Sequence, residues 1–153
     1  MNPLPPVLVF AWGNPSRGDE ALGPAVFDRL EQQKLPGVEV ITDFQLQIEH
    51  STDIANRAKV IFIDASLSAK APYELARIYP EKDDSFTSHA MSPQSLLSIS
   101  QQVNDSALPD CYMLAIRGYD FELGHEISSK AQENLERAYT KLYEFLTISN
   151  KNP

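Results

Sequence analysis

Three side chains that could bind a metal ion or transfer a proton lie far apart in the sequence, at Glu20, Asp64 and His89. Two carboxylates and one imidazole, if they converge, form a site for a divalent transition metal and leave positions open for substrate or water. Imidazole favours nickel, copper, iron or zinc over calcium and magnesium. No local motif joins these residues, because long stretches of chain separate them. Only the fold can bring them together.

The acidic positions also have structural interpretations. Asp19 and Glu20 close a glycine-containing turn over residues 13–20, and acidic residues in the first turn of a helix interact favourably with its positive end. The turn has neither the Gly-Lys-Ser/Thr ending of a Walker A loop nor the spaced glycines of a dinucleotide fingerprint. Asp64 ends an apolar run, where a carboxylate loses its water unless it faces a cavity, a cation or a donor. An Asx turn or a helix cap would also explain Asp64.

The histidine of the predicted site has two competitors. His89 lies in a serine-containing loop, where an isolated histidine is usually just solvated. His50 and His125 lie beside acidic residues, Glu49 and Glu126, and compete with His89 on composition. Sequence chemistry by itself does not choose among the three histidines.

Nucleophilic catalysis by a side chain has little support in the sequence. Cys111 lies inside an apolar run, and no cationic neighbour is in view to lower the pKa of its thiol, so we expect an inert buried residue. Ser66, Ser68 and Ser88 lack the Gly-x-Ser-x-Gly elbow of α/β hydrolases.

The pattern of apolar runs and amphipathic segments predicts an α/β fold. Strands are expected at residues 7–11, 38–42, 60–64 and 111–116. Helices are expected at 21–34 and 49–58, from a Ser92–Pro93 cap onward, and from residue 128 or 129 onward. Strand-helix repeats of this kind give parallel strands joined by right-handed crossovers. The segment 72–80 alternates apolar and polar residues between prolines, which predicts an edge or antiparallel strand.

This topology points again to the first three candidates. Ligands in open α/β sheets bind beyond the carboxyl ends of the strands. Glu20 follows the first expected strand, Asp64 ends the third, and His89 lies in the loop after the segment 72–80.

The composition is that of a single globular domain spanning residues 1–153. The 13 Lys and Arg against 21 Asp and Glu give a net charge of −8, which repels phosphate backbones, so we expect no nucleic-acid partner. The longest apolar run, residues 7–12, is far shorter than the roughly 20 residues of a membrane span. The N-terminus lacks the features of a signal peptide, and the single cysteine excludes an internal disulfide. We therefore expect a cytoplasmic protein with no membrane contact.

Several blocks of the sequence resemble the nickel-iron hydrogenase maturation endopeptidases. Residues 10–24, Phe-Ala-Trp-Gly-Asn-Pro-Ser-Arg-Gly-Asp-Glu-Ala-Leu-Gly-Pro, have that family's Gly-Asn, four residues, an acidic pair and then a glycine. The match continues through residues 43–49, 61–65, 88–90 and 118–128, in the family's order. The first two blocks are most similar to the branch that serves soluble, bidirectional NAD-linked hydrogenases.

The resemblance implies a protease that removes the C-terminal extension of a nickel-iron hydrogenase large-subunit precursor after nickel insertion. The family's metal-contacting and catalytic residues fall on Glu20, Asp64 and His89, with the nickel carried by the substrate rather than resident in the protease. Asp43 falls on a further acidic position of the family. The implied fold is a three-layer α/β/α sandwich around a mixed, mostly parallel five-stranded sheet. We expect a monomer.

Two other functions stay open at the level of sequence. A non-catalytic, nickel-dependent chaperone or adaptor would dock the precursor without cutting it. An α/β small-molecule hydrolase would act on esters or nucleosides without a protein partner.

Overall fold

The computed structural model describes residues 4–82, 91–104 and 107–148. In this part of the chain five strands form one sheet, in the order β2-β1-β3-β5-β4. The strands are β1 (Val7–Trp12), β2 (Val38–Asp43), β3 (Lys59–Ser66), β4 (Tyr73–Ile78) and β5 (Asp110–Arg117). Every neighbouring pair is parallel except β4 with β5. The mixed sheet and its antiparallel edge strand are therefore confirmed.

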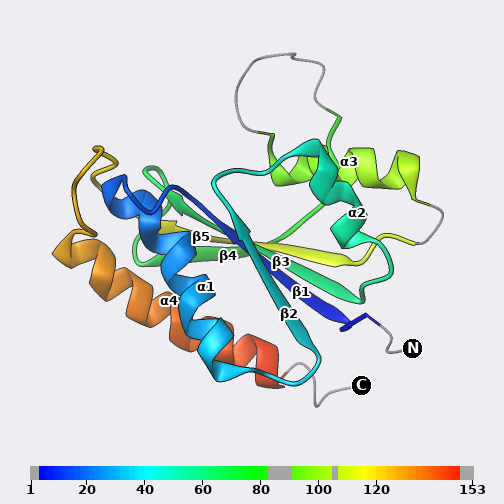
Figure 1. Ribbon diagram of the computed structural model, residues 1–153, viewed down its shortest axis with the longest axis horizontal. Coiled ribbons are helices and arrows are strands. Elements are labelled where there is room, and N and C mark those ends of the chain that lie inside the picture. Colours follow the sequence, from blue (N-terminus) through cyan, green and yellow to red (C-terminus); the bar gives the residue numbers. More distant parts are fainter. Residues whose placement is uncertain (1–3, 83–90, 105–106, 149–153) are drawn as a thin grey trace.

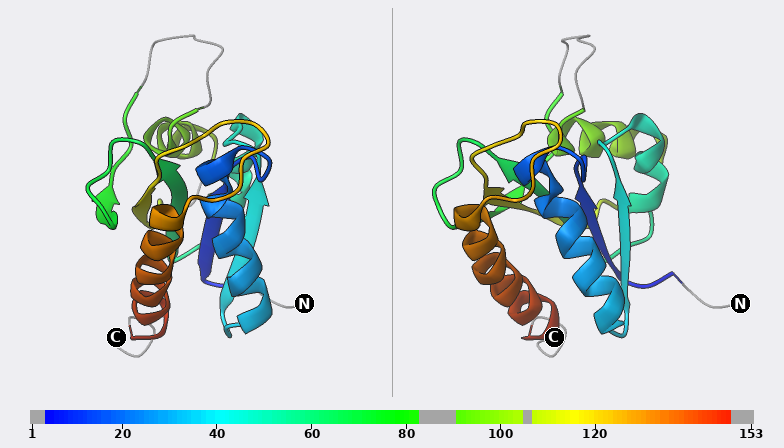
Figure 2. Two further views of the ribbon diagram at one scale, coloured as in Figure 1. Left: turned by 90° about the vertical axis from the view of Figure 1, so that its left-hand side faces the viewer. Right: turned by 60° about the vertical axis from the view of Figure 1, so that its left-hand side comes forward.

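Helices cover both faces of the sheet. On one face α1 (Leu22–Gln33) and α4 (Ser129–Ile148) lie side by side, and α2 (Ser51–Ile54) and α3 (Pro93–Val103) cover the other face (Figure 1 and Figure 2). A separate apolar cluster fills the space between the sheet and each helical layer. The expected three-layer α/β/α sandwich is confirmed.

Side chains of the central strand β1 alternate between the two clusters. Val9 and Ala11 face α1 and α4, whereas Phe10 and Trp12 face α2 and α3. All six residues of β1 are buried. Burial on both faces explains why this strand is a continuous apolar run in the sequence rather than an alternating one.

Two helical segments differ from the prediction. A 3-10 turn, η1 (Gly18–Ala21), precedes α1. The helix expected at 49–58 is shorter: η2 (Ile48–His50) leads into the single turn of α2. Ala55 is already extended, and Asn56 has a φ of 64°, which asparagine tolerates better than most residues. This reversal ends α2 and lets the chain enter β3 at once.

The predicted end of the third strand is also wrong. β3 continues past Asp64 to Ser66, because β5 pairs with it as far as Arg117. On the other side of β3, pairing with β1 ends at Ile63. Asp64 thus lies inside β3, one residue past the last residue that pairs with β1, where only β5 still pairs with β3.

The order of the connections makes a topological switch point between β1 and β3. From β1 the chain passes through α1 to β2, and from β2 it passes through α2 to β3 on the other side of β1. The connections after β1 and β3 therefore lead away from each other. In open α/β sheets such a switch point is where ligands bind, outside the carboxyl ends of the strands.

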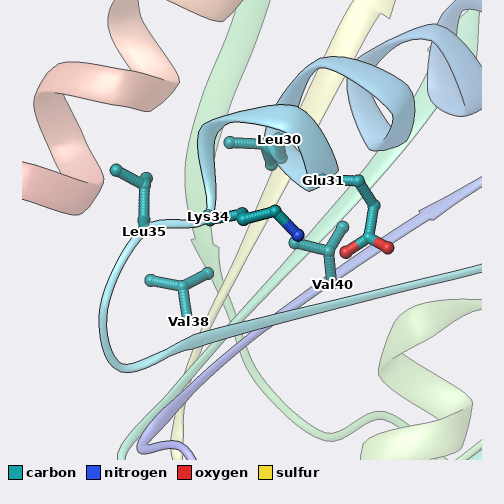
Figure 3. A pocket seen from close by; sticks show the side chains of 6 residues that line it. All are labelled: Leu30, Glu31, Lys34, Leu35, Val38 and Val40. Carbon is teal, nitrogen blue, oxygen red and sulfur yellow. The ribbon is translucent and has the colours of Figure 1, made fainter.

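A separate hollow lies toward the other end of β2, beside the last turn of α1 (Figure 3). It has a volume of about 260 Å³, and its charged lining residues are Glu31 and Lys34. Its apolar lining residues are Leu30, Leu35, Val38 and Val40. Neither Glu20 nor Asp64 lines it, so it is distinct from the switch point. Among the described residues, no helix has the length and apolar character needed to cross a membrane.

Candidate functional site

Two glycines let the turn after β1 close over the end of that strand. Gly13 has a φ of 151°, and a Cβ there would lie 2.1 Å from the carbonyl oxygen of Glu20. A Cβ at Gly23 would lie 2.1 Å from the carbonyl oxygen of Trp12. Both distances are far inside van der Waals contact, so the close backbone approaches require glycine. They place Glu20 directly beyond the carboxyl end of β1.

Asp19 and Glu20 are adjacent but have different surroundings. Asp19 is fully buried, whereas Glu20 is partly exposed. The Asp19 carboxylate accepts hydrogen bonds from the backbone N–H groups of Tyr119 (2.7 Å), Asp120 (3.1 Å) and Ser128 (2.6 Å) and from the Ser128 hydroxyl (2.9 Å). These bonds hold the loop between β5 and α4 beside the start of α1 (Figure 1). Asp19 and Glu20 do lie in the first turn of a helical segment, η1, but no side-chain hydrogen bond caps η1 or α1 among the described residues. The Asp19 carboxylate instead fastens this loop.

Asp64 faces α2 and α3, because alternation along β3 puts it on the same side as Phe62. Burial is the largest of the effects that raise the pKa of Asp64 to about 7. The negative charge of Glu20 also raises this pKa, while hydrogen bonds from the Ala65 backbone and the Trp12 side chain lower it. Two carboxyl groups that repel in this way favour either a retained proton or a cation between them.

A hollow of about 470 Å³ opens between the turn after β1 and the segment after β2. Its lining residues are Asn14, Arg17, Glu20, Asp43, Phe44, Gln45 and Gln47. Glu20 belongs to both parts of the site, since it lines the hollow and its charge acts on Asp64. Asp43 is paired in register with Trp12, so Asp43, Trp12 and Asp64 follow one another across β2, β1 and β3.

The structure separates the three histidines. His89 lies outside the described residues, so its place as the third ligand stays a prediction. The chain re-enters the described part at Met91, which packs on the α2 and α3 side of the sheet, the side that carries Asp64. His50 has 14% of its side chain exposed, and its Nε2 lies 3.3 Å from Oδ2 of Asp43. A histidine that the sequence did not favour thus lies beside the hollow.

His125 belongs to an exposed group with Asp120 and Glu122. Its Nδ1 lies 2.6 Å from Oδ2 of Asp120, and its Nε2 lies 3.3 Å from Oε2 of Glu122. Potential ligand atoms of the three residues lie within 4.8 Å of one another. The hydrogen bond between His125 and Asp120 raises the pKa of the histidine and lowers that of the aspartate. Since a proton and a metal compete for the same nitrogen, this arrangement favours an ion pair over a metal site.

The described residues at the switch point suit reactions that transfer a proton. A carboxyl group with a pKa near 7 can accept or give up a proton at neutral pH, as general acid–base catalysis requires. A cation would lower this pKa and hold Glu20 and Asp64 together as carboxylates. Cys111 is buried, and burial raises the pKa of its thiol to about 12. The predicted inertness of this cysteine is consistent with that environment, so water is the better nucleophile for this site.

Reasoning from residue types missed the pair formed by Asp43 and His50. Asp43 came into consideration only through the family resemblance. The sequence nevertheless indicated Asp43, because this residue ends the second strand. Ligands in open α/β sheets bind beyond the carboxyl ends of the strands, and this applies to the second strand as it does to the first and third. The proximity of His50 had no such signal, since it depends on how η2 folds back toward β2.

Comparisons with known proteins bear on the fold. No family model and no curated protein matches the chain. Among solved structures, the chain is similar to the hydrogenase maturating endopeptidase HybD from E. coli, with a TM-score of 0.73 and 23% identity, covering 94% of this chain and 93% of that one. It is also similar to the NiFe hydrogenase maturation protease HycI from Thermococcus kodakarensis KOD1, with a TM-score of 0.71 and 23% identity. This match covers 93% of this chain and 92% of that one. At these identities the likeness establishes a shared fold over nearly the full length of each chain.

Proposed function

We propose that this chain is an endopeptidase that removes the C-terminal extension of a nickel-iron hydrogenase large-subunit precursor. The observation that carries the proposal is the pair Glu20 and Asp64 at the switch point, where burial and like charge raise the pKa of Asp64 to about 7. Two solved structures that share the fold are named as a hydrogenase maturating endopeptidase and a hydrogenase maturation protease. The sequence blocks that resemble this family support the same function.

Nickel carried by the precursor is the proposed checkpoint. Glu20, Asp64 and His89 contact this metal, so that a loaded large subunit is positioned for cleavage. A desolvated carboxylate beside a second one is costly without a compensating positive charge. A nickel-loaded precursor supplies that charge and a nickel-free precursor does not, which gives the site a physical basis for discrimination.

Cleavage then follows the ordinary course of peptide hydrolysis. The oxygen of a water molecule adds to the scissile carbonyl carbon, the carbon–nitrogen bond breaks, and a proton from the water ends on the new amine. Either a carboxylate at the switch point or the substrate's nickel activates the water.

The test is to incubate the purified protein with nickel-loaded and nickel-free precursor and to measure the mass of the products. The loaded precursor should lose its extension and the nickel-free precursor should not. Glu20→Gln, Asp64→Asn and His89→Ala should each lower the rate by about 100-fold or more, because each removes a group that contacts the reacting centre. Asp28→Asn, an exposed carboxylate on α1, is the matched control and should cleave normally.

Other results would assign a different function. A stable complex with the precursor and no loss of mass indicates a nickel-dependent adaptor. Turnover of small esters without cleavage of any precursor indicates a small-molecule hydrolase. Equal cleavage of both precursors keeps the protease but removes the nickel checkpoint.

We further propose that the substrate is the precursor of a soluble, NAD-linked hydrogenase and that the protease acts as a monomer. The resemblance of residues 10–24 and 43–49 to the branch that serves soluble, NAD-linked hydrogenases supports this choice of substrate. Faster cleavage of that precursor than of a membrane-bound hydrogenase precursor, measured side by side, is the expected result. The reverse order would contradict it.

A further inference from the structure

Both carboxylate oxygens of Asp43 have a close polar contact, one of them a hydrogen bond. Oδ1 accepts a hydrogen bond from the backbone N–H of Phe44 at 2.7 Å. Oδ2 lies 3.3 Å from Nε2 of His50. The carboxylate lines the same hollow as Glu20. A carboxylate has about four lone-pair sites, so two contacts leave it able to accept further hydrogen bonds from a molecule in the hollow.

The His50 ring is fixed from a second side. It lies edge-on to Phe10, with ring centroids 4.4 Å apart and an angle of 85° between the planes. The backbone N–H of Gln47 donates a hydrogen bond to Nδ1 of His50 at 2.8 Å. A ring nitrogen that accepts a hydrogen bond carries no proton, so in the neutral ring the proton is on Nε2, the nitrogen nearest Asp43. The backbone of η2 thus selects the tautomer that presents a donor to the carboxylate.

We propose that His50 is a positioning residue, which holds the Asp43 carboxylate in the hollow so that it accepts a hydrogen bond from an O–H or N–H group at the scissile bond. This inference rests on the proposed protease function. The donor is either the attacking water or a peptide N–H of the precursor. Both present the same chemistry to Asp43, and kinetics separates them, as described below.

A purely structural role for His50 makes the opposite predictions. His50 and Gln47 form a capping box at η2, in which each side chain accepts a hydrogen bond from the other residue's backbone. If this were the whole role of His50, only the acceptor at Nδ1 would matter. If His50 positions Asp43, the donor at Nε2 matters more. Two substitutions separate the acceptor role of Nδ1 from the donor role of Nε2.

His50→Asn places a carbonyl oxygen near the position of Nδ1, so it keeps the acceptor for Gln47 and removes the donor toward Asp43. His50→Gln extends an amide N–H toward the position of Nε2, so it keeps the donor and loses the acceptor. Both substitutions remove the ring contact with Phe10, so we expect His50→Asn to lower the melting temperature slightly and no more than His50→Gln does. His50→Asn should also lose about 10- to 100-fold in kcat/KM, the usual range for residues that orient a catalytic group. His50→Gln should stay within about threefold of the unsubstituted protein. The exposed His125→Asn is the matched control and should have no effect on cleavage.

The kinetic constants identify the group that donates a hydrogen bond to Asp43. A lower kcat with an unchanged KM in His50→Asn indicates the attacking water, and a higher KM indicates a peptide N–H of the bound precursor. In an Asp43→Asn background, His50→Asn should cause little further loss, because the histidine acts through that carboxylate. Nitrogen-15 NMR of the histidine ring should find the proton of neutral His50 on Nε2.

Three results would overturn the proposal. One is normal cleavage by His50→Asn together with impaired cleavage by His50→Gln. Another is a proton on Nδ1 in the NMR spectrum. The last is full additivity of the His50 and Asp43 substitutions. Failure of the proposed function gives a different result, in which the unsubstituted protein cleaves no precursor while the NMR measurement still reports the tautomer.

Discussion

Asp19 lies in the connection after β1 and is fully buried, whereas Asp64 lies inside β3 and is partly buried, and the two carboxyl groups differ in the donors that surround them. Asp19 is fully buried and accepts four hydrogen bonds, three of them from backbone N–H groups. Among the described residues, the donors that act on Asp64 are the Ala65 backbone and the Trp12 side chain, and the charge of Glu20 repels it. Burial raises the pKa of Asp64 to about 7.

This difference separates a structural carboxylate from a reactive one. The four donors around Asp19 replace the hydration that its carboxylate loses on burial, so this group has little to gain from a ligand. A partly buried carboxylate with fewer donors, such as Asp64, is less well compensated for its lost hydration, so it gains more from a proton or a metal ion. The sequence shows the same residue type at both positions, and the surrounding donors decide which role each one has.

The largest effect is expected from Asp19→Ala. The substitution leaves three backbone N–H groups and the Ser128 hydroxyl without their acceptor, and each unsatisfied buried donor costs about 1–3 kcal/mol. We expect the free energy of unfolding to fall by roughly 4 kcal/mol, measured by urea denaturation. Asp28→Ala, on the exposed side of α1, should change it by less than about 0.5 kcal/mol. Similar stabilities of the two variants would contradict a structural role for the Asp19 carboxylate.

An intermediate effect is expected from the pH dependence that Asp64 contributes. Its pKa is about 7 in the folded protein against an ordinary value of 3.8, so the folded chain keeps a proton that the unfolded chain releases. The contribution of Asp64 to stability therefore falls as the pH rises from about 4 to about 7, and the loss is complete above that range.

Asp64→Asn removes this dependence while keeping the size of the side chain. The free energy of unfolding of the variant, relative to the unsubstituted protein, should increase by about 2 kcal/mol between pH 5 and pH 8. Urea denaturation at the two pH values measures the change, with Asp28→Asn as the control. Parallel pH profiles for Asp64→Asn and the unsubstituted protein would show that Asp64 is not desolvated.

The smallest effect is expected from Ser128→Ala, which removes the hydroxyl donor from Asp19. This hydroxyl donates to the Asp19 carboxylate at 2.9 Å and accepts a hydrogen bond from the backbone N–H of Ala131 at 3.4 Å, while the backbone N–H groups that also bind Asp19 remain. We expect a loss of about 1 kcal/mol in the free energy of unfolding and no change in cleavage. Ser129→Ala, at an exposed neighbouring position, is the control. A loss as large as that of Asp19→Ala would mean that the hydroxyl, not the set of donors, fixes the loop.

The fold could be predicted from local patterns, because those patterns record burial and capping directly. The continuous apolar run of β1 follows from burial on both faces. The start of α3 was predicted from Ser92 and Pro93, and the Ser92 side chain does accept a hydrogen bond from the Ser95 backbone at 3.1 Å. The ends of α2 and β3 were not predicted, since they depend on a chain reversal at Asn56 and on how far β5 extends beside β3.

For the candidate site, local patterns in the sequence were enough to identify which residues follow the strands and which types of side chain they carry. Glu20 and Asp64 were identified in this way, because the carboxyl ends of parallel strands share one edge of the sheet. The folded chain adds what the sequence could not give: four donors fasten Asp19, fewer donors surround Asp64 among the described residues, and His50 lies beside Asp43. The reason is physical: the pKa of a carboxyl group and the tautomer of an imidazole depend on donors and charges from distant parts of the chain, which become neighbours only when the chain is folded.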